Sequence, residues 1–105
     1  LSIGTIESRK NHLMLFQAWL ALLRRHGAEV VPDLVCVGKQ GWLAEAALAL
    51  HANSPVLRER VQLLHAVPDA ALDALIRGSL FTVQASHYEG WGLPVTEALA
   101  AGKAV

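Results

Sequence analysis

The chain has 105 residues, of which 53% are hydrophobic and 17% are charged. This length suits one domain, and the hydrophobic content supports a packed core and excludes a disordered chain. Nine basic and nine acidic residues give a formal net charge of zero, which argues against nucleic acid or an anionic membrane as the main partner.

The amino-terminal third predicts a strand followed by a helix. Residues 1–6 form a short apolar run, which is typical of a buried strand. Apolar residues then recur every three or four positions from Leu13 to Leu23, which predicts an amphipathic helix. We expect Asn11 to cap the start of this helix and Gly27 to end it.

Further apolar runs predict strands at 34–38, 61–65 and 80–84, and another strand is expected to begin at 104. Because helical segments separate these runs, right-handed crossovers would build a Rossmann-like parallel sheet with helices on both faces. The single cysteine, Cys36, lies within the second run. It excludes an intrachain disulfide, and we expect it to be a small buried hydrophobe.

Two more helices are predicted between these strands. The first covers about 42–51 and is followed by a break and then by a short turn or helical piece at 56–60. The second covers about 69–77, with Asp69 as its cap and Gly78 as its stop. The loops that follow the predicted strands would all lie along the carboxyl edge of the sheet, where such sheets bind ligands.

The last of these loops is the most informative segment of the chain. Pro94 suits the first position of a helix and Gly102 suits the residue just past its end, so a helix is expected from about 94 to 101. Glu97 would then lie in the first turn, near unpaired N–H groups, and Glu89 on the loop that leads into the helix.

Two glycines widen the range of backbone conformations open to this loop. Gly90 and Gly92 flank Trp91 and allow the backbone, with Leu93, to approach a ligand closely, which suits phosphate or hydroxyl groups. A glycine-rich turn before a helix is also common in α/β proteins that bind nothing there, and glutamates in a first turn stabilise helices without a ligand. Spacing alone therefore leaves both interpretations open.

A family resemblance favours the ligand-binding interpretation. The segment Ser86-His-Tyr-Glu-Gly-Trp-Gly-Leu-Pro-Val-Thr-Glu-Ala98 is similar to the Glu-x7-Glu signature of the retaining glycosyl transferases group 1 family, which has the GT-B fold. The segments Ile3-Gly-Thr-Ile-Glu-Ser-Arg-Lys-Asn11, Val37-Gly-Lys-Gln-Gly-Trp42 and Leu64-His-Ala-Val-Pro-Asp69 resemble the same family in the same order. The resemblance covers essentially the whole chain.

This resemblance implies roles for individual residues. Glu97 would accept hydrogen bonds from the ribose hydroxyls of a nucleoside diphosphate sugar. Glu89, the candidate catalytic residue, would face the donor sugar near the reacting carbon, and its action as a nucleophile or as an electrostatic stabiliser stays open. Basic side chains would neutralise the diphosphate leaving group. The expected substrate-binding residues are Arg9, Lys10, Gly90, Trp91, Gly92, Leu93 and Glu97.

Other positions depart from the family pattern or give weaker signals. Thr5 stands where family members commonly carry an arginine that contacts the diphosphate, so phosphate binding would rest on the basic residues that follow. Lys39 and Trp42 border the expected site, but a tryptophan at a helix start is more often part of the core. His65 ends an apolar strand, so we expect a partly buried residue more than a ligand.

The resemblance also implies the setting of the domain. Residues 1–105 would be most of the donor-binding, carboxy-terminal half of a GT-B enzyme, truncated at both ends, with the acceptor-side residues in a missing amino-terminal domain. The parent would transfer a sugar to a glycan or lipid-linked acceptor, with GDP-mannose as the first choice of donor, because the Gly-Thr-x-Glu-x-Arg-Lys-Asn wording is common among mannosyltransferase-like members. The fragment alone should be inactive.

No cofactor or metal is expected, since the histidines and the cysteine show no metal-ligand spacing. The parent is expected in the cytoplasm, because no apolar run is long enough to cross a bilayer. Peripheral association of the parent with the inner membrane face and a dimer of the fragment remain open. The alternative function is a non-catalytic nucleotide-binding or interaction module of Rossmann-like fold.

Overall fold

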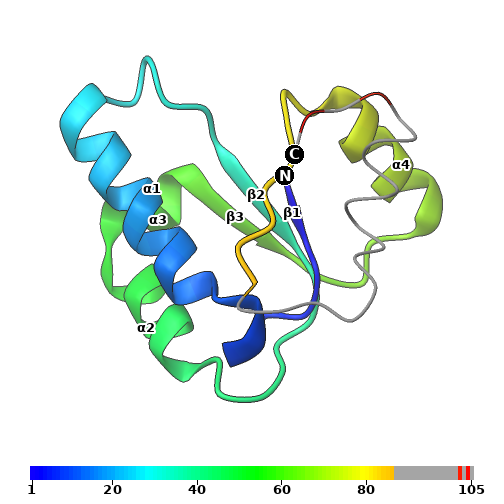
Figure 1. Cartoon of the computed structure of the whole chain (residues 1–105), viewed down its shortest axis with the longest axis horizontal. Coiled ribbons are helices and arrows are strands. Elements are labelled where there is room, and N and C mark those ends of the chain that lie inside the picture. The colour runs from blue at the N-terminus through cyan, green and yellow to red at the C-terminus, as the bar shows by residue number, and fades with distance from the viewer. Residues whose placement is uncertain (87–101, 103, 105) are drawn as a thin grey trace.

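A computed structural model describes residues 1–86, 102 and 104 of the chain. Its described part contains a parallel sheet of three strands in the order β1–β2–β3. The strands are β1 (Ser2–Ile3), β2 (Leu34–Val37) and β3 (Val61–Leu64), and the helices are α1 (His12–His26), α2 (Glu45–Asn53), α3 (Pro55–Arg60) and α4 (Asp69–Gly78), with a short 3₁₀ helix, η1 (Ser8–Lys10). Helices α1, α2 and α3 cover one face of the sheet and α4 covers the other, which confirms the predicted α/β fold (Figure 1).

Hydrogen bonds extend the sheet beyond β1. The amino group of Leu1 donates to the carbonyl of Phe81 at 3.1 Å, and the N–H of Val83 donates to the carbonyl of Leu1 at 2.8 Å. This is the pattern of a parallel pair, so the extended segment 81–83 lies on the opposite side of β1 from β2. The predicted strand at 80–84 is nevertheless wrong as a regular strand, because the described pairing reaches only Leu1.

Thr82 connects this segment to the end of the chain. Its N–H donates to the carbonyl of Ala104 at 2.7 Å, and its hydroxyl donates to the same oxygen at 3.3 Å. The sheet therefore extends from β1 in both directions, to β2 and β3 on one side and to segment 81–83 and Ala104 on the other. A sheet with this order has its topological switch point at β1.

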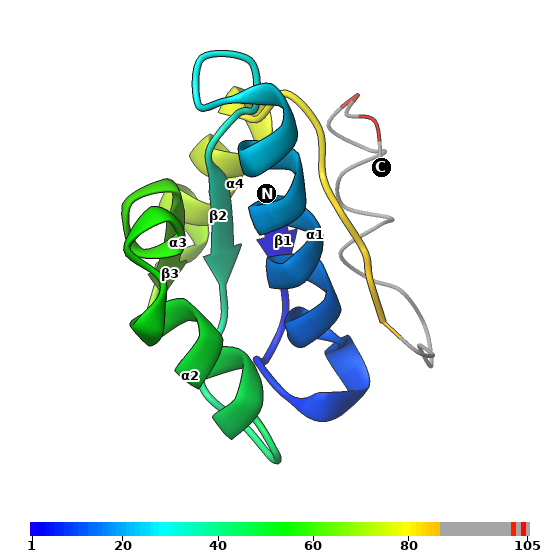
Figure 2. The same ribbon diagram turned by 90° about the vertical axis from the view of Figure 1, so that its left-hand side faces the viewer.

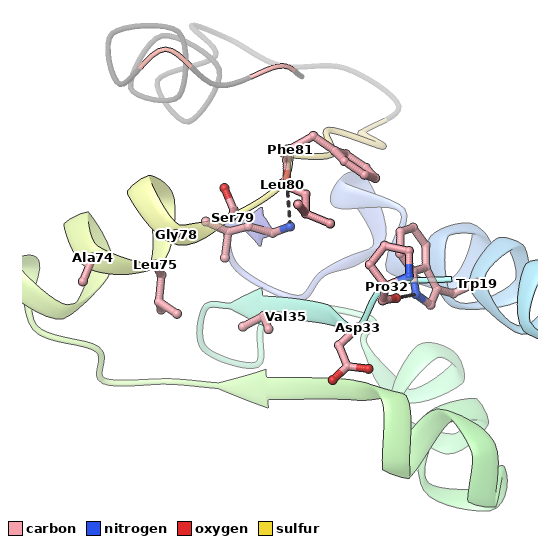
Figure 3. Close-up of a pocket in the computed structure, with 11 residues that line it drawn as sticks. Trp19, Pro32, Asp33, Val35, Ala74, Leu75, Gly78, Ser79, Leu80 and Phe81 are labelled. Carbon is pink, nitrogen blue, oxygen red and sulfur yellow. Dashed lines mark hydrogen bonds between the residues drawn. The ribbon is translucent and has the colours of Figure 1, made fainter. Parts of the chain in front are cut away.

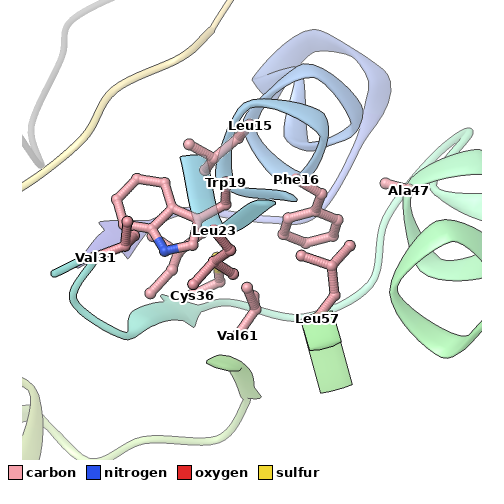
Figure 4. Packing of buried hydrophobic residues seen from close by; sticks show 10 residues of the cluster. Leu15, Phe16, Trp19, Leu23, Val31, Cys36, Ala47, Leu57 and Val61 are labelled. Carbon is pink, nitrogen blue, oxygen red and sulfur yellow. The ribbon is translucent and has the colours of Figure 1, made fainter. Parts of the chain in front are cut away.

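The main core lies between the sheet and helices α1 to α3. Phe16 of α1, Leu34 of β2 and Leu57 of α3 are fully buried there, and Trp19 is anchored by its indole N–H, which donates to the carbonyl of Pro32 at 3.0 Å. Figure 4 shows how these side chains meet those from α2 and β3. The buried cluster consists of Leu15, Phe16, Trp19, Leu23, Val31, Leu34, Cys36, Ala47, Leu57 and Val61.

Alternation along β2 assigns residues to the two faces, as expected for a strand buried on both sides. Leu34 and Cys36 pack with the cluster under α1, whereas Val37 packs with Leu1 and with Ile76 of α4. Figure 1 shows β2 between α1 and α4, and Figure 2, turned by 90°, looks onto the face of the sheet covered by α1, α2 and α3, with α4 behind β2. The expectation that Cys36 is buried is confirmed, and its exposed fraction is 0%.

Helix ends were predicted less well than helices. Gly27 does end α1, with φ 84° and its N–H donating to Leu23, but Asn11 adopts a left-handed φ of 59° and its side chain caps nothing. Asp69 is the first residue of α4 and not its cap, a position held by Pro68. Helix α2 begins at Glu45, three residues after the predicted start, because Leu43 has φ 55° and cannot continue a right-handed helix.

Candidate functional site

Two loops are joined along the carboxyl edge of the sheet. Residues 4–11 follow β1 and residues 38–44 follow β2, and parallel pairing continues between them after both strands have ended, with a bridge between Ile6 and Gln40. Because backbone groups hold the loops together, they form one platform in place of two independent loops. The bonds run from Gly4 N–H to Val37 (2.8 Å), Ile6 N–H to Lys39 (2.8 Å), Gly41 N–H to Ile6 (2.8 Å) and Ser8 N–H to Trp42 (3.0 Å).

Gly38 makes the close approach of these loops possible. Its N–H donates to the carbonyl of Leu64 at 2.8 Å, while its α-carbon faces the backbone of Gly4. A Cβ at position 38 would lie 1.9 Å from the Gly4 carbonyl oxygen, a distance that no side chain can accommodate. The sequence carried a signal for this contact, a glycine directly after each of two neighbouring strands, but that pairing was not predicted.

Lys10 lies over the end of β1. A Cβ placed on Gly4 would be 3.5 Å from Lys10 Cε and 3.8 Å from Lys10 Nζ, so the lysine side chain folds back across the Gly4 backbone. The ammonium group is therefore held at the carboxyl end of β1, beside the topological switch point. This is the position at which sheets of this kind bind phosphates, and it is where Lys10 was expected.

Arg9 is engaged by an acidic neighbour in the same loop. Its Nε donates to Glu7 Oε1 at 3.2 Å, and its Nη2 lies 3.1 Å from the same oxygen. The side chains of Arg9 and Glu7 are 36% and 20% exposed, so water screens the pair only in part. An anionic ligand at Arg9 would compete with Glu7, a residue whose role the sequence did not indicate.

His12 is buried behind the loop. Its side chain is 3% exposed, neither ring nitrogen has a hydrogen-bond partner, and its ring packs edge-on against Phe16 with centroids 5.9 Å apart. Burial lowers the pKa of His12 below its ordinary value, Lys10 lowers it further, and Glu7 opposes the shift. His12 is therefore a neutral wall of a cavity of about 190 Å³ that also contacts Ser8 and Asn11.

Trp42 and Leu43 point away from the core. Their side chains are 84% and 70% exposed, so the expectation that a tryptophan at this position belongs to the core is wrong. The left-handed backbone at Leu43 delays the helix and leaves Trp42 on the loop. Both residues border an open hollow of about 540 Å³ whose other lining residues are Thr5, Glu7, Lys39, Gln40, Gly41 and Glu45.

His65 follows β3 at the same edge of the sheet. It is exposed, which overturns the expectation of a partly buried residue. The other predicted site residues, Glu89, Gly90, Trp91, Gly92, Leu93 and Glu97, lie outside the described residues. Of the expected site, the structure thus places Arg9 and Lys10 together on the platform, and it gives no position for the Glu-x7-Glu segment.

The opposite end of the sheet holds an apolar cavity. It has a volume of about 300 Å³ and lies between the amino ends of β1 and β2 and the end of α4 (Figure 3). Among its described lining residues Asp33 has the only charged side chain, and its carboxylate lies 3.0 Å from Arg60 Nε. An apolar lining with one carboxylate is unsuited to a diphosphate, so this cavity is not the predicted nucleotide site.

Two features are absent from the described residues. No helix among them is both long and apolar enough to cross a membrane, and their histidines, cysteine and acidic residues form no group of three suited to a metal ion. Burial raises the pKa of the Cys36 thiol to about 12. Cys36 is thus protonated at neutral pH, and a buried thiol is a poor nucleophile.

Comparison with known proteins gives a consistent result. The family model for glycosyl transferases group 1 matches residues 1–105. The chain is 34% identical over 98 residues to a serotype-specific mannosyltransferase WbdA of Escherichia coli, an alignment that covers 93% of this chain and 12% of that protein. It is 37% identical over 103 residues to O-antigen chain mannosyltransferase B of Escherichia coli, covering 97% of this chain and 26% of that protein. No solved structure shows significant similarity.

Proposed function

Because this chain belongs to the glycosyl transferases group 1 family, we propose that it is the donor-binding domain of a longer retaining glycosyltransferase. It spans 12% to 26% of the length of the relatives named above, so the remaining parts of the active site would come from other segments. The parent transfers a hexose from a nucleoside diphosphate sugar to a glycan or lipid-linked acceptor. GDP-mannose is the proposed donor, since both named relatives are mannosyltransferases.

The placement of Lys10 is the observation that carries this proposal. Its ammonium group folds back over Gly4 at the carboxyl end of β1. A diphosphate at this edge would gain a charge-assisted hydrogen bond from Lys10 Nζ. As the bond between the sugar and the diphosphate breaks, negative charge grows on the leaving oxygen, and a fixed cation stabilises that charge more in the transition state than in the ground state.

The remaining roles follow the family motif. Glu97 would bind the ribose hydroxyls, and Glu89 would face the sugar whose anomeric carbon gains positive charge during transfer. Arg9 is a second cation for the diphosphate, in exchange with its pairing to Glu7. The backbone N–H groups near Gly92 and Leu93 would add neutral donors, with Gly90 and Trp91 completing the loop.

Calorimetric titration of GDP, UDP, ADP and GDP-mannose tests this proposal. We expect GDP and GDP-mannose to bind, and a Lys10→Ala variant to bind GDP about tenfold or more weakly, as for the loss of a hydrogen bond to a charged group. The matched control is Arg25→Ala, which removes an exposed cation from the last turn of α1, at the opposite end of that helix. Equal affinity in both variants would contradict the role of Lys10.

The isolated chain is expected to bind the donor without transferring sugar. A GT-B active site lies between two domains, and the acceptor-side groups would come from the other one. The test is a transfer assay with GDP-mannose and mannose oligosaccharides, in which the purified 105-residue chain forms no elongated product. Turnover by this chain would show that it carries a complete active site.

A further inference from the structure

Trp42 has an exposed aromatic side chain on a backbone that hydrogen bonds hold in place. Its ring is 84% exposed, whereas its carbonyl accepts a hydrogen bond from Ser8 N–H at 3.0 Å. The preceding residue, Gly41, donates its N–H to Ile6 at 2.8 Å. The backbone that carries the ring is therefore fixed to the loop that carries Lys10, so a ligand would meet the exposed ring at a defined position on the platform.

Leu43 holds the backbone in a conformation that a leucine rarely adopts. Its φ is 55°, and a left-handed backbone is unfavourable for a residue other than glycine because its Cβ approaches the following carbonyl oxygen. The next residue, Ala44, is buried, while Leu43 itself is 70% exposed, so the turn keeps Trp42 and Leu43 outside the core. Strain of this kind is concentrated at ligand-binding positions.

The hollow beside Trp42 has the chemistry of a carbohydrate subsite. Its lining side chains include a hydroxyl (Thr5), an amide (Gln40), an ammonium group (Lys39) and two carboxylates (Glu7 and Glu45). This mixture offers both donors and acceptors, and it lacks the single positive sign that phosphates, nucleic acids or anionic membranes require. A pyranose ring has a C–H face that an aromatic ring can cover and a rim of hydroxyls that both donate and accept.

From these observations we propose that Trp42 and this hollow form a sugar subsite that stacks a pyranose ring. The inference rests on the proposed function and extends it, because it places a second recognition element next to the diphosphate position. Glu7 links the two, since it lines the hollow and pairs with Arg9. The ring belongs either to the donor sugar or to a glycan acceptor, and the two sources share this chemistry.

Variants of Trp42 test the subsite. The probes are α-linked mannotriose, GDP and GDP-mannose, each titrated into the wild type, Trp42→Ala and Trp42→Phe by NMR. Because Trp42 is mostly exposed, both variants should fold, which thermal unfolding verifies. The matched control is Leu80→Ala, which removes a side chain of similar exposure, 77%, from the amino end of the sheet.

If the stacked ring belongs to an acceptor, Trp42→Ala should weaken mannotriose binding at least fivefold and leave the affinities for GDP and GDP-mannose unchanged. If the stacked ring is the donor sugar, Trp42→Ala should lower the affinity for GDP-mannose to the affinity for GDP. Trp42→Phe, which keeps an aromatic face, should retain part of the binding in either case, and Leu80→Ala should retain all of it.

The proposed subsite would be overturned if Trp42→Ala binds mannotriose and GDP-mannose as tightly as the wild type does. A wild-type chain that neither binds mannotriose nor prefers GDP-mannose to GDP would overturn it as well. If the wild-type chain does not bind GDP, the proposed function is contradicted instead. The mannotriose titration still reports on Trp42 separately.

Discussion

The two ends of the sheet differ in what they offer a ligand. The amino end holds an apolar cavity beside Leu1, Asp33 and Phe81, whereas the carboxyl end presents paired loops with Lys10 folded over Gly4. The apolar cavity looks more like a binding pocket for a small apolar molecule, yet its described lining has no cationic side chain that would recognise a diphosphate. Chemistry and topology therefore identify the site better than the shape of a cavity.

Substitution of Gly38 should have the largest effect on this comparison. Gly38→Ala places a methyl group against the Gly4 carbonyl, which separates the two loops, and we expect a loss of at least about 3 kcal/mol in the free energy of unfolding. The control at the amino end is Gly78→Ala, where a Cβ would meet nothing within 4 Å. It should stabilise the protein by about 0.5–1 kcal/mol. Urea denaturation measures both, and similar stability of the two variants would contradict the close approach at Gly38.

Arg60 is the main polar anchor of the amino end. Its Nη2 donates to the carbonyls of Ala28 (2.9 Å) and Val31 (3.1 Å), and its Nε lies 3.0 Å from Asp33 Oδ1. Arg60→Leu should lower the free energy of unfolding by about 1–3 kcal/mol, because it removes two hydrogen bonds from a charged group and an ion pair. GDP affinity should stay unchanged. A variant that stays as stable as the wild type but loses GDP binding would place the GDP site at the amino end of the sheet, against this account.

His12 should make stability depend on pH. Its pKa is lower in the folded chain than in the unfolded chain, so the unfolded state binds the extra proton first as the pH falls. Stability is complete above about pH 6.5, the ordinary value, and decreases as the pH falls from there toward the folded pKa. The decrease should largely vanish in His12→Leu, measured by urea denaturation between pH 7.5 and 5. The same slope in both proteins would assign the effect to another histidine.

Glu7 gives the smallest expected change. Glu7→Gln removes the carboxylate that pairs with Arg9 and should raise the affinity for GDP about threefold, since a partly exposed ion pair contributes only about 0.2–1 kcal/mol. The measurement is calorimetric titration at low and at high salt, and the gain should shrink at high salt. Weaker GDP binding in this variant would show that Glu7 serves the ligand directly.

Much of the fold followed from local patterns. The strands at 34–37 and 61–64 and the helix ending at Gly27 were predicted, because each carries a mainly apolar run or a helical period. The start of α2 was predicted too early, since nothing local in Leu43 announces a left-handed backbone that tertiary contacts impose. Asn11 was assigned a capping role, but its own left-handed conformation removes the side chain from that position.

The candidate site was predictable in part. Lys10 was identified from the family motif and from its place after a strand. His12 was missed, although the pattern contained a signal: it stands four residues before Phe16 and seven before Trp19, on the buried stripe of α1. The contact between Gly4 and Gly38 joins two segments far apart in the chain. The glycine after each strand signals this contact only once the two strands are known to be neighbours.

The most direct test of the account is chemical-shift mapping of GDP on the ¹⁵N-labelled chain. We predict that the largest amide shifts fall on the paired loops at the carboxyl edge, around Gly4, Lys10 and Gly38, with little change at Leu75, Gly78 or Leu80. Shifts concentrated around the amino-end cavity would contradict the assignment of the nucleotide site to the carboxyl edge.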